Sequence, residues 1–187
     1  SMYQRRENQK EKFTPQAVTP EKSQEENMTE FVLGSYRLEV DVEATRAWYG
    51  RYGNATGGCG CAYCRNYAAA VGVLPPEAAA FLEPLGLNLR RPGDIGEYGP
   101  RQGGRWYMPM WHIAGRLLEA GEGELPVAPG VTAGFATDMG PFLRNFPEPC
   151  FQCWLSVTLP WVLEEPADEA ADDRDDEVKT LDRRTES

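Results

Sequence analysis

The stretch Cys150-Phe151-Gln152-Cys153-Trp154-Leu155-Ser156-Val157-Thr158-Leu159 decides the fold class, because its apolar side chains recur at every second position. The residues that share this period are Phe151, Cys153, Leu155, Val157 and Leu159. Successive side chains of a β-strand point to opposite faces, so the pattern predicts a strand with one face against a core. We expect this strand to cover residues 150–163.

Further strands are predicted on both sides of this stretch. In Tyr36–Val42, apolar and polar residues alternate, which indicates a strand with one solvent-exposed face. Runs rich in β-branched and aromatic residues predict two more, over residues 105–117 and 131–137.

Helices are expected between the first strand and the later ones. Asp41 is a suitable N-cap for a helix that ends near Tyr52, and a second helix is predicted over residues 63–73. A third begins at Pro75-Pro76, where proline fits the first turn, and ends before Gly86. The chain is therefore predicted to be an α+β protein, with an antiparallel sheet and about three helices from its first half.

Composition divides the 187 residues into one domain and two tails. Residues 1–28 lack apolar periodicity and are predicted to be a disordered lead-in. Residues 164–187 carry eleven acidic residues against four basic ones, a net charge of −7, and are predicted to be an acidic disordered tail. The single α+β domain is then expected to cover residues 29–163, with a net charge of only −3.

Several classes of function are disfavoured by the same composition. No window approaches eighteen uninterrupted apolar residues, so we expect a cytoplasmic protein without a membrane span. Basic residues of the domain are scattered, and the one local group is Arg90-Arg91, followed by Arg101 and Arg105. This distribution argues against direct nucleic-acid binding.

The segment Cys59-Gly60-Cys61-Ala62-Tyr63-Cys64 places three of the chain's five cysteines within six residues. In a reducing compartment, clustered cysteines are more often metal ligands or catalytic groups than disulfides. The cluster follows Gly57-Gly58 and precedes a predicted helix, so the backbone can curl and direct several sulfur atoms to one point. This pattern predicts a zinc site at Cys59, Cys61 and Cys64.

Two alternatives supply the remaining zinc ligands. His112, the single histidine, would complete a tetrahedral site with the three thiolates. Otherwise Cys150 and Cys153 would join Cys61 and Cys64, although positions three apart on a strand point to opposite faces. His112 as a hydrogen-bonded core residue and Cys153 as a small apolar core residue are the structural alternatives.

Taken together, the residues favour a non-enzymatic binding or adaptor domain with a structural zinc site and a protein partner. The alternative is a thiol-dependent or redox enzyme that uses the same cysteines, with or without His112. A third hypothesis is that the acidic tail mimics nucleic acid and inhibits a basic enzyme. The amide of Asn66 is expected either to donate to the sulfur atoms or to cap a loop.

Four segments together resemble a family of small uncharacterised bacterial proteins, and the resemblance covers roughly residues 35–165. They are Leu38-Glu39-Val40-Asp41-Val42-Glu43-Ala44-Thr45-Arg46, Cys59-Gly60-Cys61-Ala62-Tyr63-Cys64-Arg65-Asn66-Tyr67, Phe81-Leu82-Glu83-Pro84-Leu85-Gly86 and Leu159-Pro160-Trp161-Val162-Leu163. The resemblance implies a cytosolic bacterial protein with one compact domain. It implies no activity, substrate or cofactor, and the pair Cys150/Cys153 lies outside the family's pattern.

Overall fold

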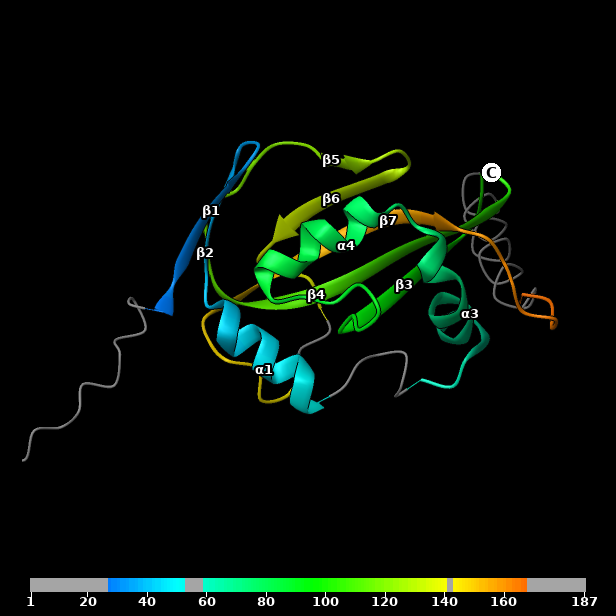
Figure 1. Ribbon diagram of the computed structural model, residues 1–187, viewed down its shortest axis with the longest axis horizontal. Coiled ribbons are helices and arrows are strands. Elements are labelled where there is room, and N and C mark those ends of the chain that lie inside the picture. Colours follow the sequence, from blue (N-terminus) through cyan, green and yellow to red (C-terminus); the bar gives the residue numbers. More distant parts are fainter. Residues whose placement is uncertain (1–26, 53–58, 141–142, 168–187) are drawn as a thin grey trace, which may run out of the picture.

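A computed structural model describes residues 27–52, 59–140 and 143–167 of the chain (Figure 1). Within these residues the molecule consists of one antiparallel sheet of seven strands and three α-helices. The predicted α+β class with an antiparallel sheet is therefore confirmed. None of the helices in the described part of the chain is both long and apolar enough to cross a membrane.

The sheet is organised around one long strand, β4. Along one of its edges β4 pairs first with β3 and then with β2, and along its other edge it pairs with β7. The order of the main path is β1-β2-β4-β7-β6-β5, with β3 beside β4. The strands are β1 (Thr29–Leu33), β2 (Tyr36–Val40), β3 (Asp94–Arg101), β4 (Gly104–Glu119), β5 (Leu125–Ala128), β6 (Val131–Ala136) and β7 (Cys150–Leu159).

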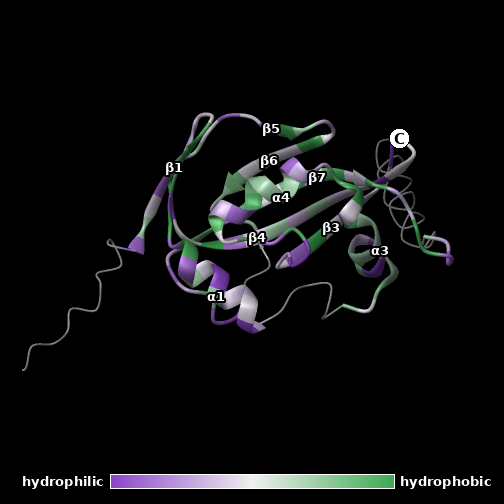
Figure 2. Cartoon of the chain, viewed as in Figure 1, coloured by the Kyte–Doolittle hydropathy of each residue, from purple (hydrophilic) through white to green (hydrophobic). Residues whose placement is uncertain are grey.

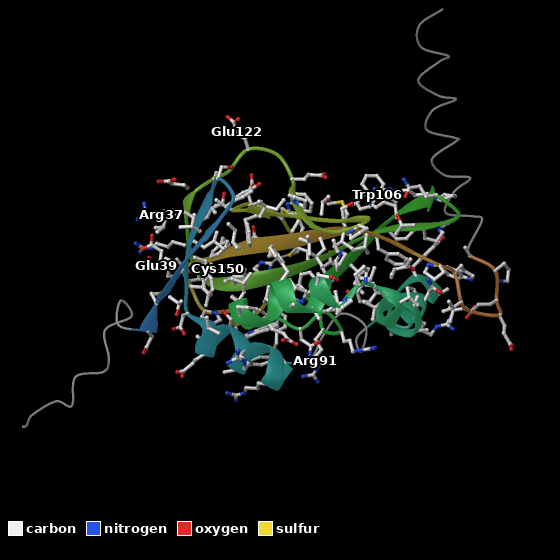
Figure 3. All side chains as sticks on the ribbon, turned by 45° about the horizontal axis from the view of Figure 1, so that its top comes forward. Arg37, Glu39, Arg91, Trp106, Glu122 and Cys150 are labelled. Carbon is white, nitrogen blue, oxygen red and sulfur yellow. The ribbon has the colours of Figure 1, made fainter. Side chains whose placement is uncertain are left out.

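The helices lie on one side of the sheet, as Figures 1 and 3 show from two directions. They are α1 (Val42–Tyr52), α3 (Ala62–Ala70) and α4 (Pro76–Leu82), and short 3-10 turns at Val71–Val73 and Glu83–Leu85 extend the last two. The predicted N-cap of α1 is confirmed, because the carboxylate of Asp41 accepts a hydrogen bond from the backbone N–H of Ala44 at 3.0 Å. Helix α1 buries Thr45 and Tyr49, which lie one turn apart.

The alternating face of β7 forms the centre of the core, as its sequence predicts. Its five apolar residues from Phe151 to Leu159 are at most 1% exposed. Helix residues Tyr67 and Leu82 and strand residue Trp111 complete the same cluster, and all three are fully buried. Burying one such side chain stabilises a fold by about 1.5–3 kcal/mol. Figure 2 shows hydrophobic colour on parts of several strands and hydrophilic turns on α1.

Some boundaries differ from the sequence prediction. Strands β1, β3 and β5 were not predicted, and β3 lies in a glycine- and proline-containing segment whose register shifts between Glu97 and Pro100. Strand β7 ends at Leu159 rather than at residue 163, because Pro160 has no N–H to donate to a sheet. The helix predicted over residues 63–73 ends at Ala70, and Val71–Val73 forms a tighter 3-10 turn.

The predicted tails lie largely outside the described residues, which begin at Asn27 and end at Ala167. Disorder of residues 1–28 and 164–187 therefore stays a prediction. The first residues of the acidic segment contact the domain, since Glu165 forms an ion pair with Arg65 of α3 and its backbone oxygen accepts a hydrogen bond from Trp161 Nε1 at 2.7 Å.

Candidate metal centre

Helix α3 begins with a sulfur atom in the position that a serine or aspartate oxygen usually takes. Cys61 is the N-cap residue, with extended backbone angles (φ −69°, ψ 156°), and its Sγ accepts a hydrogen bond from the backbone N–H of Cys64 at 3.5 Å. An N-cap side chain points back along the first helical turn. The cap therefore brings the side chain of Cys61 close to that of Cys64.

The sulfur atoms of Cys59, Cys61 and Cys64 converge on one point. They lie within 4.8 Å of one another, and among the described residues they form the one group of at least three metal-ligating side chains at such spacing. Cys59 and Cys61 are exposed, whereas Cys64 is only 8% exposed and lies at the edge of the core. The structure thus brings the three predicted thiol ligands together in an arrangement that can hold a metal ion.

The environment of the sulfur atoms differs from one to the next. The pKa of Cys59 is lowered, chiefly because the backbone N–H of Cys61 donates to its sulfur, with further hydrogen bonds from the other two cysteines. The pKa of Cys64 is raised, mainly by burial. Amide donors that stabilise a thiolate also orient it as a ligand, and a bound cation displaces the remaining thiol protons.

Asn66 fixes α3 to the segment that follows β7. Its side chain is fully buried, Nδ2 donates to the backbone oxygen of Pro160 at 3.1 Å, and Oδ1 accepts from the N–H of Val162 at 2.8 Å. Its amide also reaches the hydroxyl of Tyr107 at 3.4 Å. Of the two roles considered for Asn66, the structure shows the loop contact.

The aromatic rings of Tyr63 and Trp161 extend this contact, with centroids 5.7 Å apart in an edge-to-face arrangement. Tyr107 of β4 also donates to the backbone oxygen of Tyr63 at 2.9 Å. The cysteine-containing segment and the Leu-Pro-Trp segment, about 95 residues apart, therefore form one packed unit at the end of the sheet.

His112 lies in the middle of β4 and is not part of the cysteine group. It is 3% exposed, and burial lowers its pKa. Its neighbours are Phe146, whose ring centroid is 5.5 Å away, and Tyr49, whose hydroxyl accepts a hydrogen bond from the His112 backbone N–H at 2.8 Å. Its Nδ1 has no hydrogen-bond partner among the described residues.

Cys150 and Cys153 are not brought to the cluster either. Asn66 binds the chain just beyond the last residue of β7, whereas Cys150 is the first residue of that strand. A strand of this length spans about 30 Å. Figure 3 shows Cys150 near β2, at the end of the sheet opposite α3. Cys153 is fully buried and packs as a small apolar residue, as the alternative interpretation expected.

Asp94 was not predicted to lie near the cluster. This residue opens β3, and its negative charge raises the pKa of Cys59, in opposition to the stronger hydrogen bonds. It comes from a Pro-Gly-Asp segment that sequence patterns predict to be a turn. In the structure Asp94 pairs with Met110 of β4.

Comparison of the chain with protein-family models, with curated proteins and with solved structures gives no match. The family resemblance of its motifs therefore stays a prediction. Conclusions about function rest on the geometry of the site.

Proposed function

We propose that this protein is a non-enzymatic binding domain in which Cys59, Cys61 and Cys64 hold a structural zinc ion. The observation that carries the proposal is the convergence of the three sulfur atoms within 4.8 Å at the start of α3. Thiolates are soft ligands, and zinc is the common tetrahedral ion that they bind in structural sites. We also propose a cytoplasmic, bacterial setting, in which the thiols stay reduced.

The spacing of the sulfur atoms suits such an ion. With zinc–sulfur bonds of about 2.3 Å, the sulfur atoms of a tetrahedral site lie about 3.8 Å apart. Three sulfur atoms already within 4.8 Å need only small movements to reach this distance. The fourth position would be taken by water or by a side chain of a partner.

A structural role is supported by what the cysteine turn holds in place. Helix α3 follows the turn directly, and its residues bind β4 and the segment after β7. Ordering of a turn at the start of a helix costs conformational entropy. A zinc ion would offset part of this cost and fix the start of α3.

A binding role is supported by the face of the sheet that lies opposite the helices. Figure 3 shows Trp106 on this face. The guanidinium of Arg101 lies 5.2 Å from the centre of the Trp106 ring, and the neighbouring Tyr98 is 60% exposed. Ser156 accepts hydrogen bonds from both Arg101 and Trp106, which holds the pair in position. Ordered, partly exposed aromatic and arginine side chains are enriched where proteins bind partners.

The test is elemental analysis of full-length protein purified without chelator, for the wild type and for Cys61→Ser. We expect about one zinc per chain in the wild type and almost none in Cys61→Ser, because loss of one thiolate from a three-thiolate site removes most of the affinity. Cys150→Ser is the matched control, since this thiol lies at the other end of β7, and it should retain the metal. Equal zinc contents in Cys61→Ser and wild type would contradict the proposal.

The second candidate is a thiol-dependent reaction at Cys59, which is favoured by its exposure and its lowered pKa. Titration of the wild type, purified without chelator, with a disulfide reagent distinguishes the two. A single fast thiol that disappears in Cys59→Ser, together with no bound metal, would favour the enzyme. Thiols that react only after chelator treatment would favour the structural site. Mimicry of nucleic acid by the acidic tail, residues 164–187, stays a hypothesis, because most of this segment lies outside the described residues.

A further inference from the structure

A second site lies between α1 and the chain that follows α4, and no cysteine contributes to it. It is a cleft of about 860 Å³, bounded by α1, by the 3-10 turn Val71–Val73 and by the loop 86–91. Pockets that bind small molecules usually have volumes of about 300–1,000 Å³. The cleft is therefore large enough for a ligand of nucleotide size.

Three arginines line this cleft: Arg46 from α1, and Arg90 and Arg91 from the loop. Among the ion pairs of the described residues, none involves any of the three. Within the described part of the chain, Arg91 forms a long hydrogen bond, 3.4 Å, to the backbone oxygen of Tyr49. Glu83 is the one acidic residue of the lining. The cleft thus concentrates positive charge on a chain whose net charge is −10.

Core side chains hold the arginine-bearing loop in place. Trp111 Nε1 donates to the backbone oxygen of Asn88 at 3.0 Å, and the hydroxyl of Tyr67 donates to that of Leu89 at 2.7 Å. Trp111 and Tyr67 are themselves fully buried. The side-chain oxygen of Asn88 accepts from the N–H of Arg90 at 2.9 Å, which closes a local turn. A loop anchored in this way loses little entropy when it binds a ligand.

Two glycines set the positions of the walls. A Cβ on Gly72 would lie 2.9 Å from a terminal nitrogen of Arg90, so this guanidinium rests against the backbone of the 3-10 turn. A Cβ on Gly86, which has a φ of +84°, would lie 2.7 Å from the backbone oxygen of Val42, so α1 packs directly on the loop. Figure 3 shows Arg91 beside the C-terminal part of α1.

We propose that this cleft binds a small phosphate-bearing molecule whose remaining part is apolar or ring-shaped. Guanidinium groups bind phosphate oxygens through paired, charge-assisted hydrogen bonds. Apolar residues, among them Val71, Leu74 and Leu89, line the rest of the cleft and suit the body of such a ligand. The overall acidity of the chain repels a long polyanion, which favours a small ligand over nucleic acid.

The experiment is isothermal titration of the full-length protein with AMP, inorganic phosphate and adenosine as probes. We expect AMP to bind, and Arg46→Gln and Arg90→Gln each to weaken its binding about tenfold or more, the size of a lost charge-assisted hydrogen bond. Both arginines are exposed, so the variants should fold, which thermal denaturation without ligand will verify. Arg116→Gln is the matched control, because Arg116 is an exposed arginine at the far end of β4 and does not line the cleft.

The remaining outcomes are equally decisive. Displacement of AMP by inorganic phosphate would support the proposal and identify the phosphate as the anchored group. Adenosine binding as tightly as AMP, or AMP affinity unchanged in both glutamine variants, would overturn it, as would the absence of binding at millimolar AMP and phosphate. A synthetic peptide of residues 168–187 that binds the cleft more tightly than AMP would replace the small molecule with the acidic tail. These outcomes test the cleft independently of the proposed zinc site, because no cysteine lines the cleft.

Discussion

Replacement of Asn66 with alanine should release the segment after β7 from α3 and destabilise the whole domain. The substitution removes the acceptor of the Val162 N–H and the donor to the Pro160 oxygen, and it removes the weaker contact with Tyr107. The two backbone groups are only partly buried, so water replaces part of what they lose. Each of these two hydrogen bonds then contributes about 1 kcal/mol to the free energy of unfolding.

The void left by the side chain adds to this cost. Asn66 is fully buried, and a cavity of the size of a lost amide group costs about 1 kcal/mol. The total expected loss in the free energy of unfolding is therefore about 3 kcal/mol. Asn66→Asp should also be destabilising, because it keeps the acceptor for Val162 but loses the donor to Pro160 and places a carboxylate in a buried site.

Equilibrium unfolding in urea, followed by tryptophan fluorescence, measures the effect. The matched control is Asn88→Ala, since Asn88 is exposed and its side chain accepts one hydrogen bond, from the N–H of Arg90. That variant should lose less than about 1 kcal/mol. If Asn66→Ala loses no more than Asn88→Ala, the two chain segments do not depend on Asn66 for their association.

Two further predictions concern buried titratable groups. His112 is the single histidine and burial lowers its pKa, so the unfolded state takes up a proton first as the pH falls below about 6.5. Its contribution to stability is full above this pH and is lost below it, so the unfolding free energy of the wild type should decrease between about pH 7.5 and 5.5. If the urea midpoints of wild type and His112→Asn change equally with pH, His112 is not the source of the pH dependence of stability. Glu97 accepts hydrogen bonds from Arg105 Nε and from the Gly99 N–H, both at 2.8 Å, and the ion-pair side chains are 12% and 9% exposed. Glu97→Gln should cost about 2 kcal/mol because it replaces a charge-assisted hydrogen bond to Arg105 with a weaker neutral one; a thermal unfolding midpoint equal to that of the wild type would show that water already screens the pair.

Local sequence signals were sufficient to predict the elements whose apolar residues recur at a regular spacing. The alternation of β7 and the cap at Asp41 both lie within a few neighbouring residues, and the structure confirms both. The three sulfur ligands were equally local, because six residues at a helix start determine where their side chains can point. Strand β3 was missed because its glycines and proline give no apolar alternation, and its pairing with β4 supplies the order that its own residues lack.

Sequence spacing could not place the residues that meet from distant parts of the chain. His112 and Cys150 were reasonable metal ligands by residue type, but β4 and β7 carry them away from α3. Asn66 and Val162 are 96 positions apart, and their contact depends on where β7 ends. The cleft joins Arg46 to Arg90 and Arg91 only because Gly86 lets α1 pack on the loop.

The sequence by itself determined the class of fold, the division of charge along the chain and the chemistry of the cysteine turn, since each depends on residues that are close in the chain. The tertiary structure alone decided that His112 and Cys153 remain in the core, away from the cysteine turn, and which arginines face one cleft. The physical reason is that strand pairing and core packing select one arrangement from many that local preferences allow, and the burial of apolar surface from distant segments supplies most of the free energy for that selection.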